Sequence, residues 1–227
     1  MSTNTTRNNS IKNKTTILTN SFITALFFPI LVFFLKLHIS FNNFKLRHIC
    51  VFSILKLMKS NKNLVLLGMM SSGKSTIGRL LAHKLNLKFF DIDNVIENKT
   101  KMKISEIFEK KGEVLFRDLE EKITLQFLNK INCIISLGGG GFINKVIREK
   151  TQKKAIPIWL EWNPKTLINR IRKNNKRPVT LNLNDNELND LIISRSKIYS
   201  KSKYKINCEN MTKTEIIKKI IQIYETI

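Results

Sequence analysis

GMMSSGKST, at residues 68–76, matches the phosphate-loop pattern G-x-x-x-x-G-K-[ST]. An apolar run at residues 64–67 precedes it, and apolar residues at helical spacing follow it. A strand, a glycine-flanked loop and a helix in this order surround a phosphate with backbone N–H groups and the helix N-terminus. In such loops the lysine, here Lys74, reaches the β- and γ-phosphates, and the next hydroxyl, here Ser75, ligates Mg²⁺. We therefore expect the chain to bind a nucleotide.

From residue 63 onward, short apolar runs alternate with amphipathic segments. Strands are predicted at Leu64–Leu67, Lys88–Ile92, Cys133–Leu137, Ile156–Leu160 and Tyr204–Asn207. Helices are predicted at Lys74–Leu85, Ile104–Lys110, Glu113–Leu128, Asn144–Lys150, Pro164–Arg172, Asp185–Tyr199 and Lys213–Tyr224. This alternation is typical of an α/β fold, here a five-stranded parallel sheet with helices on both faces. Polar stretches at residues 173–176 and 181–189 predict a mobile loop.

The glycines are concentrated near two of the predicted strands. Seven of the eight in the chain follow the first and third strands or lie on the helix after the first. Glycine is expected where the backbone takes a positive φ or approaches a ligand closely. In an open parallel sheet, ligands bind beyond the carboxyl ends of the strands, so both glycine clusters indicate that edge.

Two carboxylates end the second predicted strand, Asp91 and Asp93. Strand alternation would place both on the same side, at the ligand edge. One could hold Mg²⁺ through water, and the other could bind and help deprotonate an acceptor hydroxyl. The alternative is an aspartate that caps the next helix, and the adjacent phosphate loop favours the catalytic interpretation.

Arginines are scarce in this chain, and several stand at positions suited to anion binding. Arg117 and Glu120, at i and i+3 on a helix, are either a surface ion pair or a carboxylate-binding fork that Glu120 orients. Arg170 and Arg177 flank the polar loop, which either closes over a nucleotide or is a solvated turn. Arg195 could face the same cleft. We expect Trp159 in the core and Trp162 at its rim.

The net charge of +23 makes nucleic acid a candidate partner. However, 31 lysines against 9 arginines, with no arginine-rich block, indicate a lysine-biased surface instead, and we expect no nucleic-acid binding. Cys50, Cys133 and Cys208 are far apart and outside any metal-binding spacing, which is typical of reduced thiols in a cytoplasmic protein.

Residues 1–57 differ from the rest, with seven Lys/Arg and no acidic residue. Their longest apolar run, residues 22–35, is shorter than the ~20 residues of a spanning helix. Three interpretations stay open: an anchor or signal-like segment, an organellar transit sequence, or sequence upstream of a true start at Met58. We favour the last, expect no catalytic role here, and assign the catalytic domain to residues 58–227.

Residues 60–208 resemble the shikimate kinase family in an ordered series of motifs. The series comprises the phosphate loop, Asp91-x-Asp93, Ser105-x2-Phe108, Gly112-Glu113-x2-Phe116-Arg117-x2-Glu120, Ser136-Leu137-Gly138-Gly139-Gly140, Trp159-Leu160, Pro164, Arg170, Arg177-Pro178 and Arg195-x3-Tyr199. The resemblance implies a three-layer P-loop kinase with a mobile lid at about residues 171–185. It also implies ATP-dependent phosphorylation of the 3-hydroxyl of shikimate, with Mg²⁺ as cofactor, by a cytoplasmic monomer.

The resemblance also implies roles for individual residues. The ATP phosphates would lie against Ser71, Ser72, Gly73, Lys74, Ser75 and Thr76. Ser75 would ligate Mg²⁺ directly and Asp91 through water. Asp93 would bind the shikimate hydroxyls and act as base, Arg117 and Arg195 would bind the carboxylate, and Glu120 would orient Arg117. Gly138, Gly139 and Gly140 would place backbone N–H groups against shikimate. Arg177 would meet the ATP phosphates from the lid, and Arg170 would pack on adenine.

The chain departs from the family pattern at a few positions. Ser71 stands where glycine is common, and Cys208-Glu209 replaces the usual Asp-Thr after the last strand. Rival hypotheses are a gluconate or nucleoside kinase of the same fold, and a catalytically inactive binding protein tethered by residues 22–35. Lys74, Asp93 and Arg117 are all present, which argues against the inactive protein.

Overall fold

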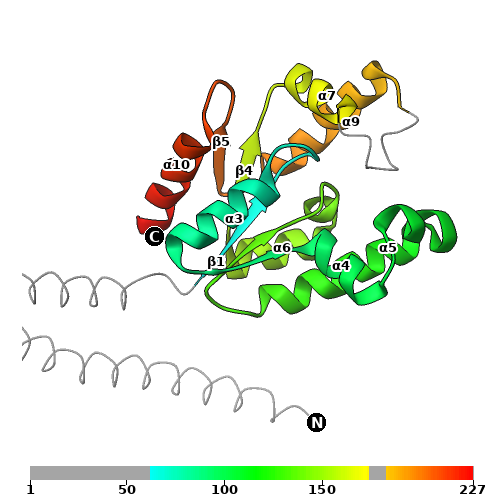
Figure 1. The fold of residues 1–227 in the computed structure, drawn as a ribbon, viewed down its shortest axis with the longest axis horizontal. Coiled ribbons are helices and arrows are strands. Elements are labelled where there is room, and N and C mark those ends of the chain that lie inside the picture. Colours follow the sequence, from blue (N-terminus) through cyan, green and yellow to red (C-terminus); the bar gives the residue numbers. More distant parts are fainter. Residues whose placement is uncertain (1–61, 174–182, 227) are drawn as a thin grey trace, which may run out of the picture. The chain divides into compact units, whose positions relative to one another are not determined.

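The structure, a computed structural model, describes residues 62–173 and 183–226. Five parallel strands form one sheet in the order β2-β3-β1-β4-β5 (Figure 1). Their bounds are β1 (Asn63–Leu67), β2 (Lys88–Asp91), β3 (Cys133–Ser136), β4 (Ala155–Glu161) and β5 (Tyr204–Asn207). The expected five-stranded parallel α/β sheet is confirmed.

Strand β1 lies at the centre of the sheet and is buried along its whole length. Leu64 pairs with Ile134 of β3 on one side and with Ile156 of β4 on the other. Successive side chains of a strand point to opposite faces, so Leu64 and Val65 enter two different apolar clusters. A parallel sheet buried on both faces needs apolar strands throughout, and the NLVLL sequence of β1 meets this need.

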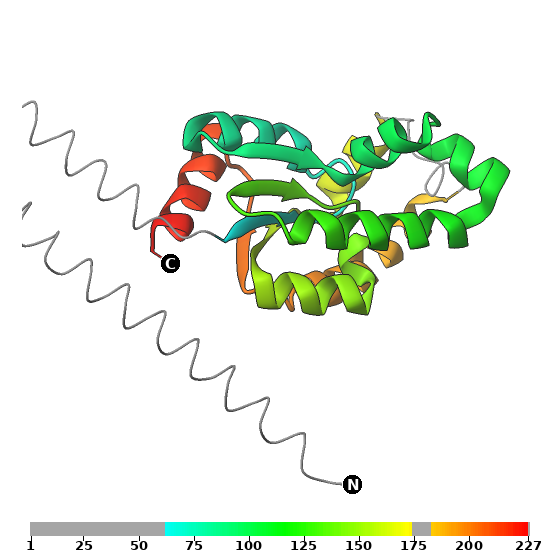
Figure 2. The ribbon, with the colours of Figure 1, turned by 90° about the horizontal axis from the view of Figure 1, so that it is seen from below.

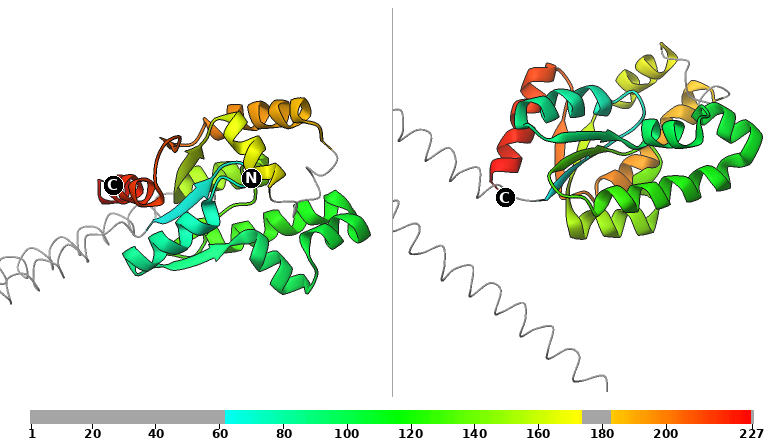
Figure 3. Two further views of the ribbon diagram at one scale, coloured as in Figure 1. Left: turned by 45° about the horizontal axis from the view of Figure 1, so that its top comes forward. Right: turned by 60° about the horizontal axis from the view of Figure 1, so that its bottom comes forward.

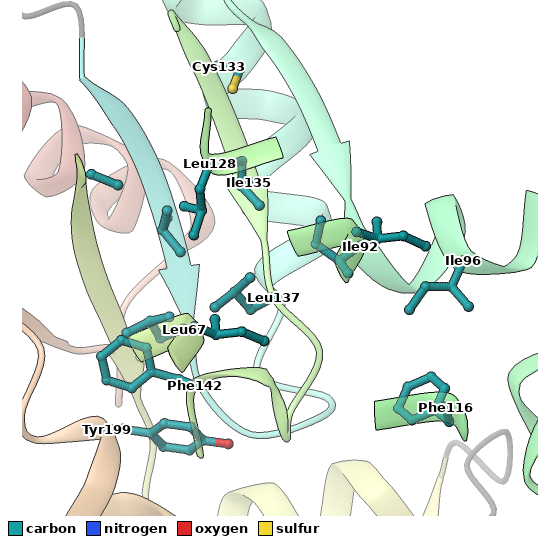
Figure 4. Close-up of a cluster of buried hydrophobic side chains, with 14 of the residues drawn as sticks. Leu67, Ile92, Ile96, Phe116, Leu128, Cys133, Ile135, Leu137, Phe142 and Tyr199 are labelled. Carbon is teal, nitrogen blue, oxygen red and sulfur yellow. The ribbon is translucent and has the colours of Figure 1, made fainter. Parts of the chain in front are cut away.

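Helices cover both faces of the sheet (Figure 2). Their bounds are α3 (Lys74–Leu85), α4 (Ile92–Thr100), α5 (Ile104–Leu128), α6 (Lys145–Lys154), α7 (Pro164–Arg172), α9 (Asp185–Tyr199) and α10 (Lys213–Glu225), with a short 3-10 helix η1 (Gly141–Ile143). Helices α3 and α10 pack on one face, and α4, α5, α6 and α9 supply the other cluster, part of which is drawn in Figure 4. Helices α7 and α9 lie side by side (Figure 3).

Helix α5 bends at Gly112, where the sequence predicts a break between two helices. The backbone there has φ 82° and ψ 166°, outside the helical region, so α5 consists of two helical segments that meet at a kink, and the predicted break is confirmed. A positive φ of this size favours glycine, which explains why the chain turns at this residue.

Two sequence predictions near the ligand edge are wrong in detail. Strand β2 ends at Asp91, and Ile92, predicted as strand, begins α4, a helix that the sequence analysis missed. Asp93 therefore lies in the first turn of a helix, and strand alternation does not place it beside Asp91. The polar stretch 181–189 is also not all loop, because Asn184 and Glu187 form a capping box that starts α9 at Asp185.

Several expectations fall on undescribed residues. The N-terminal extension with its apolar run at 22–35, Arg177 and most of the predicted lid lie outside the described ranges. Within those ranges, none of the helices is both long and apolar enough to span a bilayer.

Candidate active site

The phosphate loop connects the buried strand β1 to helix α3. Gly73, at φ 89°, occupies the N-cap position, so the first N–H groups of α3 point into the loop without a capping side chain. The Lys74 ammonium lies inside the loop, 2.8 Å from the backbone oxygens of both Gly68 and Met69. This arrangement of N–H groups, helix dipole and lysine suits a chain of phosphates.

Ser71, at the crest of this loop, has a left-handed backbone conformation with φ 60°. A side chain in this region costs roughly 1–2 kcal/mol relative to glycine. In the family that the sequence resembles, glycine is common at the position of Ser71, and the positive φ supplies the physical reason. The loop therefore keeps a strained residue beside its phosphate-binding surface.

Asp91 and Ser75 are joined at the carboxyl end of β2. The Ser75 hydroxyl donates a hydrogen bond to the Asp91 carboxylate, which is buried. Although Asp91 occupies the N-cap position of α4, its side chain makes no capping hydrogen bond, so the capping alternative is not supported. A hydroxyl and a carboxylate are hard oxygen ligands that suit Mg²⁺, which is commonly held by one or two carboxylates together with substrate phosphates. No group of three or more His, Cys, Asp or Glu side chains in the described part forms a separate metal cage.

A pocket that is partly open to solvent lies next to the phosphate loop. It is lined by Met70, Asp93, Ile104, Phe108, Phe116, Arg117, Glu120, Gly138, Gly139, Gly140 and Arg195. All seven residues that the resemblance assigns to shikimate binding are on this list. They come from α4, α5, the loop after β3 and α9, so only the folded chain brings them together.

Arg117 is held by two carboxylates of its own helix. Its Nη1 donates to Glu120 at 2.7 Å, and its Nη2 and Nε donate to Glu113 at 2.9 and 3.1 Å. Burial lowers the pKa of Arg117, but the charges and hydrogen bonds of Glu120 and Glu113 together outweigh this, and the pKa is raised overall. The sequence analysis identified Glu120 but missed Glu113, four residues before Arg117, which the i,i+4 rule could have found.

Glu120 is the buried member of this pair, with 2% of its side chain exposed. Burial raises its pKa, and the nearby Asp93 carboxylate adds to the rise, while Arg117 opposes it. A pair between a buried carboxylate and a partly exposed guanidinium differs from the surface ion pair that was the alternative interpretation. Its geometry fixes the guanidinium of Arg117 at the wall of the pocket.

The glycine loop after β3 fits between these charged groups. A Cβ at Gly138 would lie 2.6 Å from Glu120 Oε1 and 2.7 Å from Asp93 Oδ1, and one at Gly140 would lie 2.4 Å from Arg117 Nη1. A Cβ at Gly139 would lie 3.3 Å from the backbone nitrogen of Met70 in the phosphate loop. Side chains here would collide with the site, and their absence lets the backbone reach a ligand.

Helix α9 contributes Arg195 and, one turn later, Tyr199. Nη1 of Arg195 lies 3.7 Å from the sulfur of Met69, which brings this arginine to the phosphate loop. The Tyr199 hydroxyl donates a hydrogen bond to the backbone oxygen of Gly139. Burial raises the pKa of Tyr199 to about 12. Tyr199 is part of the Arg195-x3-Tyr199 motif, but no role for it was predicted from the sequence.

The remaining candidates lie on the other side of the phosphate loop. Arg170 stacks on Trp162, with the guanidinium carbon 3.7 Å from the ring centroid. Trp159 is buried in the core, and Trp162 is half-buried, as expected for a core and a rim residue. The role predicted for Arg177 stays a prediction.

The central strand carries a phosphate loop, and a separate pocket lies beside this loop at the same edge of the sheet. These two features define a P-loop kinase that acts on a small molecule. Residues 70–225 match the family model described as shikimate kinase. The chain therefore belongs to the shikimate kinase family.

Similar proteins and solved structures support the same family assignment. A shikimate kinase from Sulfurihydrogenibium sp. is 38% identical over 160 residues, which cover 70% of this chain and 96% of the relative. One from Flavobacterium psychrophilum is 39% identical and is covered over 98% of its length, against 71% of this chain. The structure of an Acinetobacter baumannii shikimate kinase in complex with shikimate has a TM-score of 0.71 at 30% identity, covering 76% of this chain and 97% of that one.

Proposed function

We propose that this protein transfers the γ-phosphoryl group of ATP to the 3-hydroxyl of shikimate, giving shikimate 3-phosphate and ADP for chorismate and aromatic amino-acid biosynthesis. One observation carries the proposal: the pocket that gathers Asp93, Arg117 and Arg195 shares Met70 with the phosphate loop. Donor and acceptor would then meet directly, as in-line transfer requires.

The acceptor side explains how a hydroxylated carboxylate would be held. Arg117 and Arg195 line the same pocket and provide two guanidinium groups for the carboxylate of shikimate. Asp93, 7% exposed, would bind the hydroxyls and accept the proton of the attacking one. The N–H groups around Gly139 would fix the ring between these ends. Glu120 and Glu113 keep Arg117 in place for this task.

The donor side would bind the ATP phosphates through the backbone of residues 71–76. Lys74 would stabilise the charge that develops on the transferred group, with Arg177 contributing from the lid. Ser75, and Asp91 through water, would hold Mg²⁺, which would supply positive charge against the phosphates. The hydrogen bond between Ser75 and Asp91 supports this assignment, because it brings both oxygens to one side of the loop.

Shikimate-dependent ADP release tests the proposal. Wild-type protein should turn over ATP with shikimate, whereas Asp93→Asn and Arg117→Ala should abolish turnover and leave ATP binding largely intact. Asp118→Asn, an exposed neighbour of Arg117, is the matched control and should behave as wild type. Wild-type-like turnover in either site variant would refute the residue assignment.

The same assay with gluconate and nucleosides tests the rival kinases. A nucleoside carries no carboxylate to occupy two arginines, so we expect no ADP release above background with nucleosides.

We also infer a cytoplasmic monomer whose catalytic domain spans residues 58–227, with a lid at about 171–185. Buried, free Cys133 and Cys208 support a reducing compartment. N-terminal sequencing of the native protein tests the start at Met58, and light scattering tests the oligomeric state.

A further inference from the structure

Trp162 follows strand β4 and contacts the phosphate loop from the side opposite the acceptor pocket. Its indole Nε1 donates a hydrogen bond to the backbone oxygen of Ser72 at 3.0 Å. Strand β4 adjoins β1 on one side, and β3, whose following loop lines the acceptor pocket, adjoins β1 on the other. A nucleotide with its phosphates in the loop and its γ-phosphate toward the acceptor would extend its base toward β4 and β5.

On this side, Trp162 holds the side chain of Arg170. The guanidinium carbon lies 3.7 Å from the centroid of the ring, so the planar cation lies flat on the indole. The Glu209 carboxylate, after β5, also attracts Arg170 electrostatically. The indole is the group in direct contact with the guanidinium and covers one of its two faces.

The helix that carries Arg170 is itself fixed to the end of the sheet. The Glu209 carboxylate, just after β5, accepts hydrogen bonds from the backbone N–H of Asn163 at 3.1 Å and from Thr166 Oγ1 at 2.7 Å. These hydrogen bonds hold the start of α7, and Trp162 directly precedes that start. Trp162 and Arg170 are therefore set in place relative to the phosphate loop.

We propose that Trp162 is the lowest layer of a three-layer stack, indole, guanidinium and nucleotide base, that binds the purine of ATP. The proposal rests on the proposed role of Arg170 and adds the residue that orders it. A planar base stacks well on a guanidinium plane, and a guanidinium already held flat loses less side-chain freedom on binding. Trp162 is in this sense a positioning residue for the base, acting through Arg170.

Calorimetric titration with ADP and with pyrophosphate tests this stack. Trp162→Leu keeps apolar bulk but removes the aromatic face, and Arg170→Lys keeps the charge but removes the plane. Each should raise the Kd of ADP about 3- to 10-fold, the range expected from a cation–π contact of about 1 kcal/mol. The Kd of pyrophosphate, which has no base, should not change. The double variant should bind ADP no more weakly than Arg170→Lys alone.

Fluorescence provides a second measurement, because the chain has only two tryptophans. Trp159→Phe leaves Trp162 as the sole emitter, and its emission should change with ADP more than with pyrophosphate. Trp162→Leu leaves the buried Trp159, whose emission should not respond.

Two results would overturn the stack. One is wild-type ADP affinity in Trp162→Leu. The other is an equal loss of pyrophosphate affinity, which would mean that Trp162 acts through Ser72 on the phosphate loop. These measurements need no turnover, so a failure of shikimate phosphorylation would leave their outcome readable and would contradict the proposed function alone.

Discussion

The hydroxyl of Tyr199 donates a hydrogen bond to the backbone oxygen of Gly139, 60 residues earlier in the chain. Figure 4 shows the Tyr199 ring beside Phe142 in the core, which fixes the direction of the hydroxyl. Arg195 lies one turn earlier on the same helix and lines the acceptor pocket. One helix therefore both presents an arginine to the acceptor and holds the glycine loop that lies opposite it.

Tyr199→Phe should weaken shikimate binding more than ATP binding. Loss of the hydroxyl leaves the buried Gly139 oxygen without this donor, at a cost of about 1–3 kcal/mol in stability, and lets the glycine loop shift. We expect the KM for shikimate to rise about 3- to 10-fold, with the KM for ATP unchanged. Tyr224→Phe, a buried tyrosine of α10 on the other sheet face, should change neither KM. Equal effects on both substrates would contradict a specific role in the glycine loop.

The raised pKa of Glu120 predicts that shikimate binding weakens at acidic pH. Its pKa is raised above the ordinary 4.5 by burial, with Asp93 adding to the rise. As pH falls through this raised pKa, Glu120 becomes neutral and its hold on Arg117 weakens. The KM for shikimate should therefore rise with acidification before ordinary carboxylates titrate. Glu120→Gln should start from a higher KM and lack this step, whereas an identical pH profile in both proteins would exclude Glu120 as its source.

The same pKa has a consequence for stability with a definite sign. Between the ordinary and the raised pKa, the native state binds more protons at Glu120 than the unfolded state does. The free energy of unfolding of wild type should therefore fall as pH rises through this window, relative to that of Glu120→Gln. Urea titrations of both proteins across the window measure the difference, and a gap that grows in the opposite direction would contradict the raised pKa.

Ser71→Gly should stabilise the protein. Ser71 has φ 60°, which costs a residue with a side chain roughly 1–2 kcal/mol, and the extra freedom of glycine in the unfolded chain offsets part of the gain. We expect a net increase of about 0.5–1 kcal/mol in the free energy of unfolding, measured by urea titration. Asn86→Gly is the control, because Asn86 has φ 53° and asparagine tolerates this region well, so its gain should be smaller. An equal gain at both sites would mean that serine is not specifically strained.

Local patterns in the sequence were enough to predict most of the fold. The bounds of α3, α7 and α9 are those predicted, because each helix has a clear apolar period and a clear start signal. Helix α4 was missed because Phe90, Asp91 and Ile92 continue the apolar–polar alternation of a strand. The signal of a helix was nevertheless present in Ile92, Val95 and Ile96, at i, i+3 and i+4.

Less of the site than of the fold could be predicted from the sequence. Motif resemblance named the residues that line the acceptor pocket, but it could not reveal that Tyr199 holds Gly139 or that Trp162 holds Arg170. Those contacts join segments far apart in the chain or depend on side-chain direction after a turn. No periodicity encodes them, and only the packed structure brings the atoms together.

Gly140→Ala should weaken shikimate binding through Arg117. The backbone of Gly140 has φ −95° and ψ −18°, which alanine adopts without strain. Its Cβ would lie 2.4 Å from Nη1 of Arg117, the end of a flexible side chain that can move away. Because Arg117 pairs with the buried Glu120, its displacement should also lower the free energy of unfolding, which urea titration measures. Displacing a charge-assisted contact worth about 1.5–3 kcal/mol should raise the KM for shikimate at least about 10-fold.

Gly78→Ala is the matched control for this variant. A Cβ at Gly78 would lie 2.3 Å from the Phe89 ring, packed against the apolar cluster beneath α3 and away from the acceptor pocket. Overpacking of this kind costs typically about 1–3 kcal/mol, so Gly78→Ala should lose stability and keep its KM for shikimate. Steady-state kinetics should therefore distinguish the two variants, because only Gly140→Ala should raise the KM for shikimate. A Gly140→Ala protein with wild-type KM would show that Arg117 binds no substrate in the position described.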